Sequence, residues 1–193
     1  MRGCTVDIGR EALQIERVRA RSPLSHRLAS IPDVLWAPAA AGGLMLLIGA
    51  IALVARHPWI FPSLGPTAFL QAEYPHHRTA DIYHVVVGHV LGMISGFLAV
   101  GLLGAMNTPP AVAGAPLSLA RLGAVAFAVT TTMLLQLLLR ASHPPAVSTT
   151  LLIALGAFDV SMHAAATIVT GVILLAVPGD LLRRVRLAAR PRR

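Results

Sequence analysis

Four long apolar runs constrain most strongly what this chain of 193 residues can fold into. They cover residues 34–55, 82–105, 117–139 and 161–182. A helix of about 20 apolar residues crosses the roughly 30 Å hydrocarbon layer of a membrane. None of the runs shows the alternation of a barrel strand, and backbone groups in lipid must be hydrogen-bonded within the protein. The sequence therefore predicts an all-α, polytopic transmembrane helical bundle.

The charged residues favour the same class and indicate an orientation. Only 12% of the residues are charged, whereas soluble domains carry about 25%. All 16 basic residues are arginines, and most lie in the terminal segments 1–33 and 183–193. Basic ends around an apolar middle are typical of the positive-inside rule. We therefore expect an integral protein of the bacterial inner membrane with two cytoplasmic Arg-rich tails, and no nucleic-acid partner.

Two shorter apolar segments, residues 57–71 and 143–158, lie between the long runs. Their prolines leave too few residues for a full helical span, which predicts short broken or re-entrant helices. The order long, short, long occurs twice, over residues 34–105 and 117–182, and predicts a two-fold internal repeat. Paired Pro- and Gly-interrupted segments in two halves are typical of a transporter site.

The number of crossings depends on whether these short segments traverse the membrane. Two cytoplasmic ends require an even number of crossings, and both four and six satisfy this condition. With six crossings, Arg78 and Arg140 lie inside, which agrees better with the positive-inside rule. Six crossings would also make the repeat an inverted one, so the sequence favours six over four.

The strongest local pattern is the segment that contains His143, Pro144 and Pro145. Proline in the first turn of a helix costs little, because its missing N–H would have no partner there. A helix start offers unpaired N–H donors and partial positive charge, to which Ser148 and Thr149 add hydroxyl donors. The pattern favours a small-anion site. The alternative is that the hydroxyls bond their own helix and the prolines only kink it.

A second segment with the same ingredients contains Ser63, Gly65 and Thr67. It combines prolines near a helix start, hydroxyl groups, and a glycine that allows close backbone approach. His89 lies within the long run 82–105, and an ionisable residue in a membrane span is a functional candidate. It is either neutral and bonded to a carbonyl, or protonated and paired with an anion.

Three glycines, Gly88, Gly92 and Gly96, recur every fourth residue in the same run. Such a stripe of small residues lets another helix approach closely, which predicts helix packing. The chain has one cysteine, no metalloprotease His motif and no nucleotide-binding glycine loop. We therefore expect no metal, no cofactor and no enzymatic activity.

The sequence His143-Pro144-Pro145, followed by a Thr-containing helix, resembles the motif that names the HPP family of integral membrane proteins. Residues 63–68 are similar to the family's Ser-x-Gly-Ala-Ser-Ala region, and residues 88–91 to its Gly-His pair. The chain departs from the family at residues 147–149, where Gly-Ala-Thr is common. On this resemblance, residues 34–182 form an HPP-type transmembrane domain.

The resemblance implies a transporter of at least four spans, and members from photosynthetic lineages are described as moving nitrite. Together with the neutral hydroxyls, it predicts a transporter or channel for a small inorganic anion, nitrite first. The alternative is a non-transporting scaffold or sensor subunit whose Arg-rich ends bind a partner or anionic lipid. The expected partners are the lipid bilayer, the anion and further copies of the chain. The candidate binding residues are Ser63, Gly65, Thr67, His89, His143, Pro144, Pro145, Ser148 and Thr149.

Overall fold

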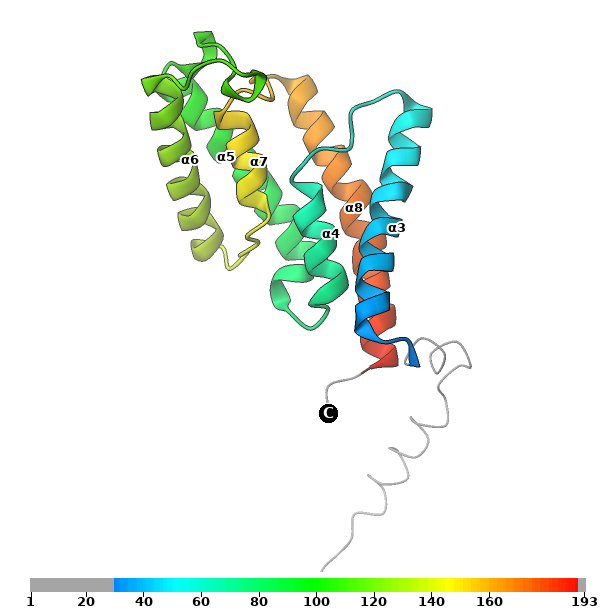
Figure 1. The fold of residues 1–193 in the computed structure, drawn as a ribbon. Helices are drawn as coiled ribbons and strands as arrows, with labels where there is room; N and C mark the ends of the chain where they lie inside the picture. The colour runs from blue at the N-terminus through cyan, green and yellow to red at the C-terminus, as the bar shows by residue number, and fades with distance from the viewer. Residues whose placement is uncertain (1–29, 191–193) are drawn as a thin grey trace, which may run out of the picture.

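The computed structural model describes residues 30–190, and every regular element in this range is a helix. Four helices are long and apolar enough to cross a membrane, and two shorter ones lie between them (Figure 1). This confirms the predicted transmembrane helical bundle. Most of the predicted N-terminal tail, residues 1–33, lies outside the described residues. The α-helices are α3 (Asp33–Ala55), α4 (Leu64–Glu73), α5 (Ile82–Leu102), α6 (Leu119–Leu138), α7 (Ala146–Ala154) and α8 (Met162–Ala189).

Each short helix is preceded by a non-helical lead-in that starts at the end of a long helix. Arg56 follows the last residue of α3 and Arg140 lies just beyond the end of α6, and both arginines have left-handed backbone angles, with φ of 56° and 50°. The next N–H bonds back five residues in both places, from His57 to Ala52 O and from Ala141 to Gln136 O. This left-handed ending turns the chain back into the bundle.

The lead-in and the short helix together run along the depth of the bundle. Residues 57–63 descend from the end of α3, and α4 continues in the same direction to the end where α5 begins (Figure 1). Residues 139–145 lead in the same way from the end of α6 to α7. Helix α7 then runs opposite to α4, toward the end of the bundle where α8 begins (Figure 1). Both the choice of six crossings over four and the internal repeat stay predictions, since four of the described helices are long and apolar enough to cross on their own.

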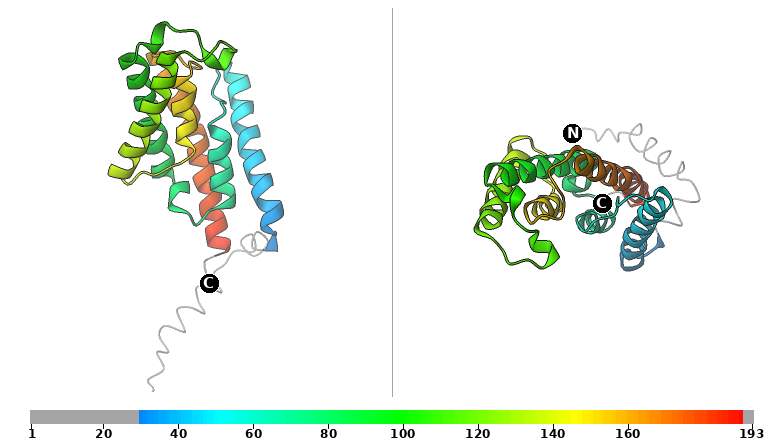
Figure 2. Two further views of the ribbon diagram at one scale, coloured as in Figure 1. Left: turned by 60° about the vertical axis from the view of Figure 1, so that its left-hand side comes forward. Right: turned by 90° about the horizontal axis from the view of Figure 1, so that it is seen from above.

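The short helices α4 and α7 lie next to each other on one side of α5 and α8, with α3 and α6 at the flanks (Figure 2). Helix α7 packs on α5 through the predicted glycine stripe. A Cβ atom on Gly88 would lie 2.6 Å from His143 Cβ, and one on Gly92 would lie 2.8 Å from Ala146 O. A Cβ on Gly96 would lie 2.9 Å from Ile153 Cβ. The three glycines therefore determine how closely α7 packs on α5.

Helix α4 packs on α8 in a similar way. A Cβ atom on Gly171 would lie 2.6 Å from Trp59 O, in the lead-in to α4, and one on Gly179 would overlap the Gln71 side chain. Each short helix thus packs on the last helix of the other half of the chain. Because each short helix packs on the opposite half, the starts of α4 and α7 lie together at the centre of the bundle.

Helix α8 continues past the apolar run 161–182 into the predicted C-terminal tail, residues 183–193. Residues 183–189 are helical, because their arginines find partners inside the bundle. Arg186, which is only 2% exposed, donates to Ile31 O at 2.8 Å, pairs with Asp33 and stacks over the Trp36 ring. Arg190 donates to Asp33 at 2.9 Å. These contacts hold the end of α8 against the start of α3, so both ends of the described chain lie at the same end of the bundle.

Candidate functional site

Five of the candidate residues form one buried group at the starts of the short helices, which we call the polar cluster. Each of the five side chains is fully buried, with 0% exposure. They come from both short helices, from the lead-ins that precede them and from α5, so segments far apart in the sequence meet at one point. The members of the polar cluster are Ser63, Thr67, His89, His143 and Thr149.

The polar cluster is a continuous chain of hydrogen bonds. Ser63 Oγ lies 2.7 Å from Thr149 Oγ1, which lies 2.7 Å from Nδ1 of His89. The other ring nitrogen of His89, Nε2, lies 3.0 Å from Thr67 Oγ1. Thr67 Oγ1 in turn lies 3.1 Å from Nε2 of His143. His89 therefore bridges one threonine from each short helix, and the chain ends at His143.

The direction of these bonds is set at His143. Its Nδ1 lies 2.7 Å from the backbone oxygen of Thr79, which only accepts, so Nδ1 carries a hydrogen and donates. In a neutral ring Nε2 is then an acceptor, and the Thr67 hydroxyl supplies its hydrogen. If Thr67 donated to Ser63 O instead, at 3.2 Å, His143 Nε2 would be buried without a donor. Such an unsatisfied group costs about 1–3 kcal/mol.

The remaining bonds follow from this assignment. Because Thr67 gives its one hydrogen to His143, Nε2 of His89 must donate to Thr67 and Nδ1 of His89 must accept. Thr149 then donates to His89, and Ser63 donates to Thr149. The neutral polar cluster thus has one polarity from Ser63 to Thr79, and its two imidazoles are opposite tautomers.

A glutamine on α6 holds the backbone of His143 in place. Gln136 is 4% exposed, and its Oε1 accepts the His143 N–H at 3.0 Å. Its Nε2 lies 3.4 Å from both Gly88 O and His143 O. Neither Gln136 nor Thr79 was among the candidate residues predicted from the sequence. A backbone acceptor such as the Thr79 carbonyl carries no residue-type signal.

The other four candidates line an open groove between α4 and α7, which we call the junction groove. It has a volume of about 640 Å³. Gly65 and Pro66 form one wall from the first turn of α4. Pro144, Pro145 and Ser148 form the opposite wall. All nine candidates therefore lie at the junction of the two short helices, five in the buried cluster and four along the groove beside it.

The first N–H groups of α7 are not free, which corrects one expectation from the sequence. Ala146, Val147 and Ser148 donate to the carbonyls three residues before them, at 3.0, 3.1 and 3.1 Å. The prolines tighten this helix start into a turn whose backbone donors are used locally. The donors available at the junction are therefore side chains rather than backbone amides.

A protein-family model described as "HPP, transmembrane region" matches residues 26–191. The chain belongs to the HPP family. No curated protein and no solved structure gives a significant match. The His-Pro-Pro motif that names the HPP family lies in the lead-in to α7. Its histidine ends the polar cluster, and its two prolines line the junction groove.

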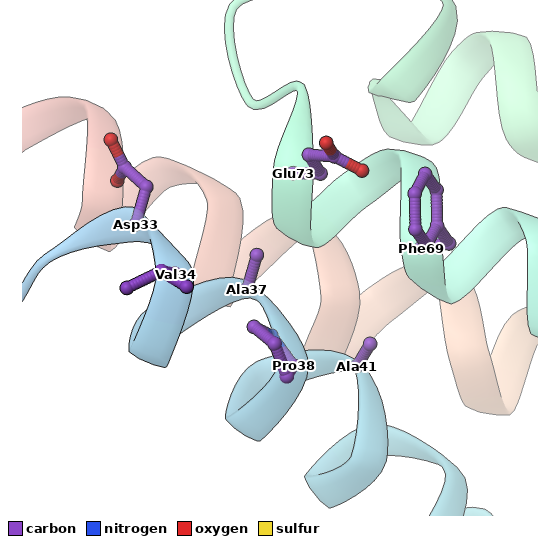
Figure 3. A pocket seen from close by; sticks show the side chains of 7 residues that line it. All are labelled: Asp33, Val34, Ala37, Pro38, Ala41, Phe69 and Glu73. Carbon is purple, nitrogen blue, oxygen red and sulfur yellow. The ribbon is translucent and has the colours of Figure 1, made fainter.

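A second groove of this HPP protein lies between α3 and α4 (Figure 3). It has a volume of about 440 Å³, and Asp33 and Glu73 stand at its rim with Phe69 beside them. Its lining offers no hydroxyl or imidazole donor, and its only charged groups are the Glu73 carboxylate and the Asp33 carboxylate that pairs with Arg186 and Arg190. None of the candidate residues lines this groove, so the junction groove is the better candidate site.

Asp81 begins α5 next to the His143 end of the polar cluster. Its carboxylate accepts from the His84 N–H at 3.0 Å and lies 2.7 Å from His84 Nδ1. Burial raises the pKa of the Asp81 carboxyl, but the bonds from His84 outweigh burial and hold the pKa below its usual 3.8. The ionised carboxylate therefore stabilises the folded chain above the unfolded-state pKa, and this stabilisation is lost as the pH falls through the folded-state pKa.

We expect Asp81→Ala to lower the stability of the protein in detergent by about 1 kcal/mol, because the α5 N-cap is lost. The difference from the wild type should shrink as the pH falls below about 4. Thermal unfolding at a series of pH values measures both effects. Asp159→Ala, at an exposed carboxylate, is the matched control and should change little. Equal losses in the two variants would contradict the role of the cap.

Proposed function

We propose that this HPP protein is an integral membrane transporter of a small inorganic anion, with nitrite as the first candidate. The observation that carries the proposal is the polar cluster, where hydroxyls from the two short helices and their starts meet two imidazoles, and all five side chains are fully buried. These groups offer hydrogen-bond donors without a fixed charge. No carboxylate belongs to the cluster or lines the junction groove, so no negative side chain there repels a small anion.

The way in which the short helices meet supports a transport path. In many transporters, broken helices from two inverted repeats end near the middle of the membrane and form the substrate site. Here α4 and α7 run in opposite directions and their starts lie at the polar cluster (Figure 1). We take this as support for six crossings and an inverted repeat, with both termini on the cytoplasmic side of a bacterial inner membrane.

The arginines that the structure describes give less support to a scaffold or sensor subunit. Arg183 donates to Pro75 O at 3.0 Å and pairs with Asp180, and Arg184 pairs with the same carboxylate at 2.6 Å. Arg186 and Arg190 hold the start of α3. These four side chains already bond within the chain, so no observation on residues 30–190 favours their binding a partner.

Nitrite flux into liposomes that contain the purified protein tests the proposal. Thr149→Val keeps the side-chain volume but removes the hydroxyl that bonds Ser63 and His89. We expect a loss of nitrite flux of about tenfold or more, since one hydrogen bond is worth about 1–1.5 kcal/mol and 1.4 kcal/mol is a factor of ten.

Thr130→Val is the matched control, because the Thr130 hydroxyl bonds its own helix at Ala126 O, 2.9 Å away, on an exposed face. Its flux should equal that of the wild type. The proposal is wrong if nitrite, nitrate, formate and chloride all move no faster than in empty liposomes at acidic, neutral and alkaline pH.

A further inference from the structure

We propose that the polar cluster is a proton relay that takes up one proton for each anion bound, which makes the protein a proton–anion symporter. The inference rests on the proposed anion transport and adds its coupling ion. Its basis is geometric. Two imidazoles and three hydroxyls form an unbroken chain, and no step between neighbouring polar atoms is longer than 3.1 Å.

The chain can hold an extra proton without losing a bond. Each hydroxyl both donates and accepts, and each imidazole has two nitrogens that can exchange these roles. When a proton enters at Ser63 Oγ, Ser63 passes its own hydrogen to Thr149, and Thr149 passes its hydrogen to Nδ1 of His89. The Nε2 hydrogen of His89 then moves to Thr67, and the Thr67 hydrogen moves to Nε2 of His143. One proton is gained, and every bond between Ser63 and His143 reverses its direction.

The relay ends at His143 because of the Thr79 carbonyl. That oxygen accepts from Nδ1 at 2.7 Å and has no hydrogen to pass on, so the extra proton stays on the ring. In the protonated ring both nitrogens donate, Nδ1 to Thr79 O and Nε2 to Thr67. His143 is therefore the storage position, and His89 and the three hydroxyls conduct the proton to it.

The surroundings of the two imidazoles contain few other ionisable groups. His89 and His143 face each other with ring centroids 5.1 Å apart. Asp81 and His84, at the start of α5, act on His143 electrostatically. The groups that α4, α6 and α7 bring to the rings are hydroxyls and the Gln136 amide. No carboxylate bonds either ring directly, so a positive charge stored there lacks a bonded counter-ion.

This missing counter-ion couples the proton to the anion. A buried charge without a partner is costly, so protonation of His143 favours an anion at the junction, and the anion favours protonation. The reversal also frees the Ser63 hydroxyl hydrogen, because Thr149 now donates to Ser63. Ser63 directly precedes α4, whose first turn lines the junction groove. The freed hydrogen is a donor for the anion. With the proton and the anion both bound, the site carries no net charge.

Solid-state ¹⁵N NMR of histidine-labelled protein in lipid bilayers tests the relay without any transport. At alkaline pH we expect His143 to carry its hydrogen on Nδ1 and His89 to carry its hydrogen on Nε2. The signals that disappear in His143→Gln and His89→Gln assign the two rings. The same tautomer on both rings would overturn the relay, because Thr67 would then face two ring acceptors or two ring donors and could not accept from one ring while donating to the other.

Initial rates of nitrite uptake into liposomes test the coupling. In the wild type, uptake above that of empty liposomes should follow an imposed pH gradient, with a limit of about tenfold accumulation for each pH unit. Nitrite uptake should not respond to a potassium diffusion potential, because the proton and the anion cross together and carry no net charge. His89→Gln should lose the response to the pH gradient. His163→Gln, at an exposed histidine of α8, should keep it.

The outcomes separate the two proposals. Wild-type uptake that follows the potential and ignores the pH gradient would overturn the relay and leave anion transport in place. Uptake that follows the pH gradient equally in the wild type and in His89→Gln would also overturn it. No uptake of any anion would overturn the proposed function, and with it the symport.

Discussion

Replacing Gly92 by valine is expected to separate α7 from α5 and to leave little folded protein. A Cβ atom at this position would lie 2.7 Å from Thr150 Oγ1 and 2.8 Å from Ala146 O. The second of these atoms is backbone, so α7 itself must move. Overpacking of this kind costs about 3 kcal/mol or more. Size-exclusion chromatography of the detergent-extracted protein measures the yield of monodisperse protein, which should fall several-fold.

Gly101→Val is the matched control for this substitution. Gly101 lies in the same helix, α5, and a Cβ atom there would meet nothing within 4 Å. The control should therefore give nearly the wild-type yield. Equal yields of the two variants would contradict the role of the glycine stripe in positioning α7 on α5.

Replacing Arg121 by methionine should cause the second large loss. Arg121 is 4% exposed at the start of α6, and its guanidinium donates to Thr108 O at 2.8 Å. It also donates to Ala154 O, at the end of α7, at 3.0 Å and to Pro109 O at 3.2 Å. Methionine fills the space but leaves three carbonyls without these donors. We expect a loss of about 3 kcal/mol, or a thermal midpoint lower by about 6–12 °C.

Arg140→Met removes the same charge at an exposed position and serves as the control. Its thermal midpoint in detergent should change little. A drop as large as that of Arg121→Met would mean that net charge, rather than the bonds to the loop and to α7, is responsible. Nitrite flux of the surviving Arg121→Met protein would also show whether the end of α7 must be held for transport.

The helices were predictable from the sequence because lipid imposes a length on apolar runs. Helices α5 and α6 begin and end within three residues of the predicted stretches. Helix α8 is longer than predicted, and its last residue is Ala189. The cause is a long-range contact with Asp33 at the start of α3, and hydropathy along one segment carries no information about such a contact.

The candidate site was predictable as a set of residues but not as an arrangement. An offset of 82 residues between the halves aligns Thr67 with Thr149. It does not reveal that both bond the same imidazole, His89, because the packing of each short helix on the opposite half determines that contact. The Thr79 carbonyl and the buried Arg121 were missed for a related reason, since both act on partners far away in the sequence.

The most direct test of the central claim, that the anion binds at the junction of α4 and α7, is protection of a single thiol there. Cys4 is the only cysteine, so a protein with Cys4→Ser and Ser148→Cys carries one thiol, placed on the junction groove. Nitrite should slow the alkylation of this thiol by a maleimide. It should not slow alkylation in a Cys4→Ser, Asp159→Cys protein, whose thiol lies at an exposed position between α7 and α8. Equal alkylation rates at Ser148→Cys with and without nitrite, in a protein that still transports nitrite, would contradict the account.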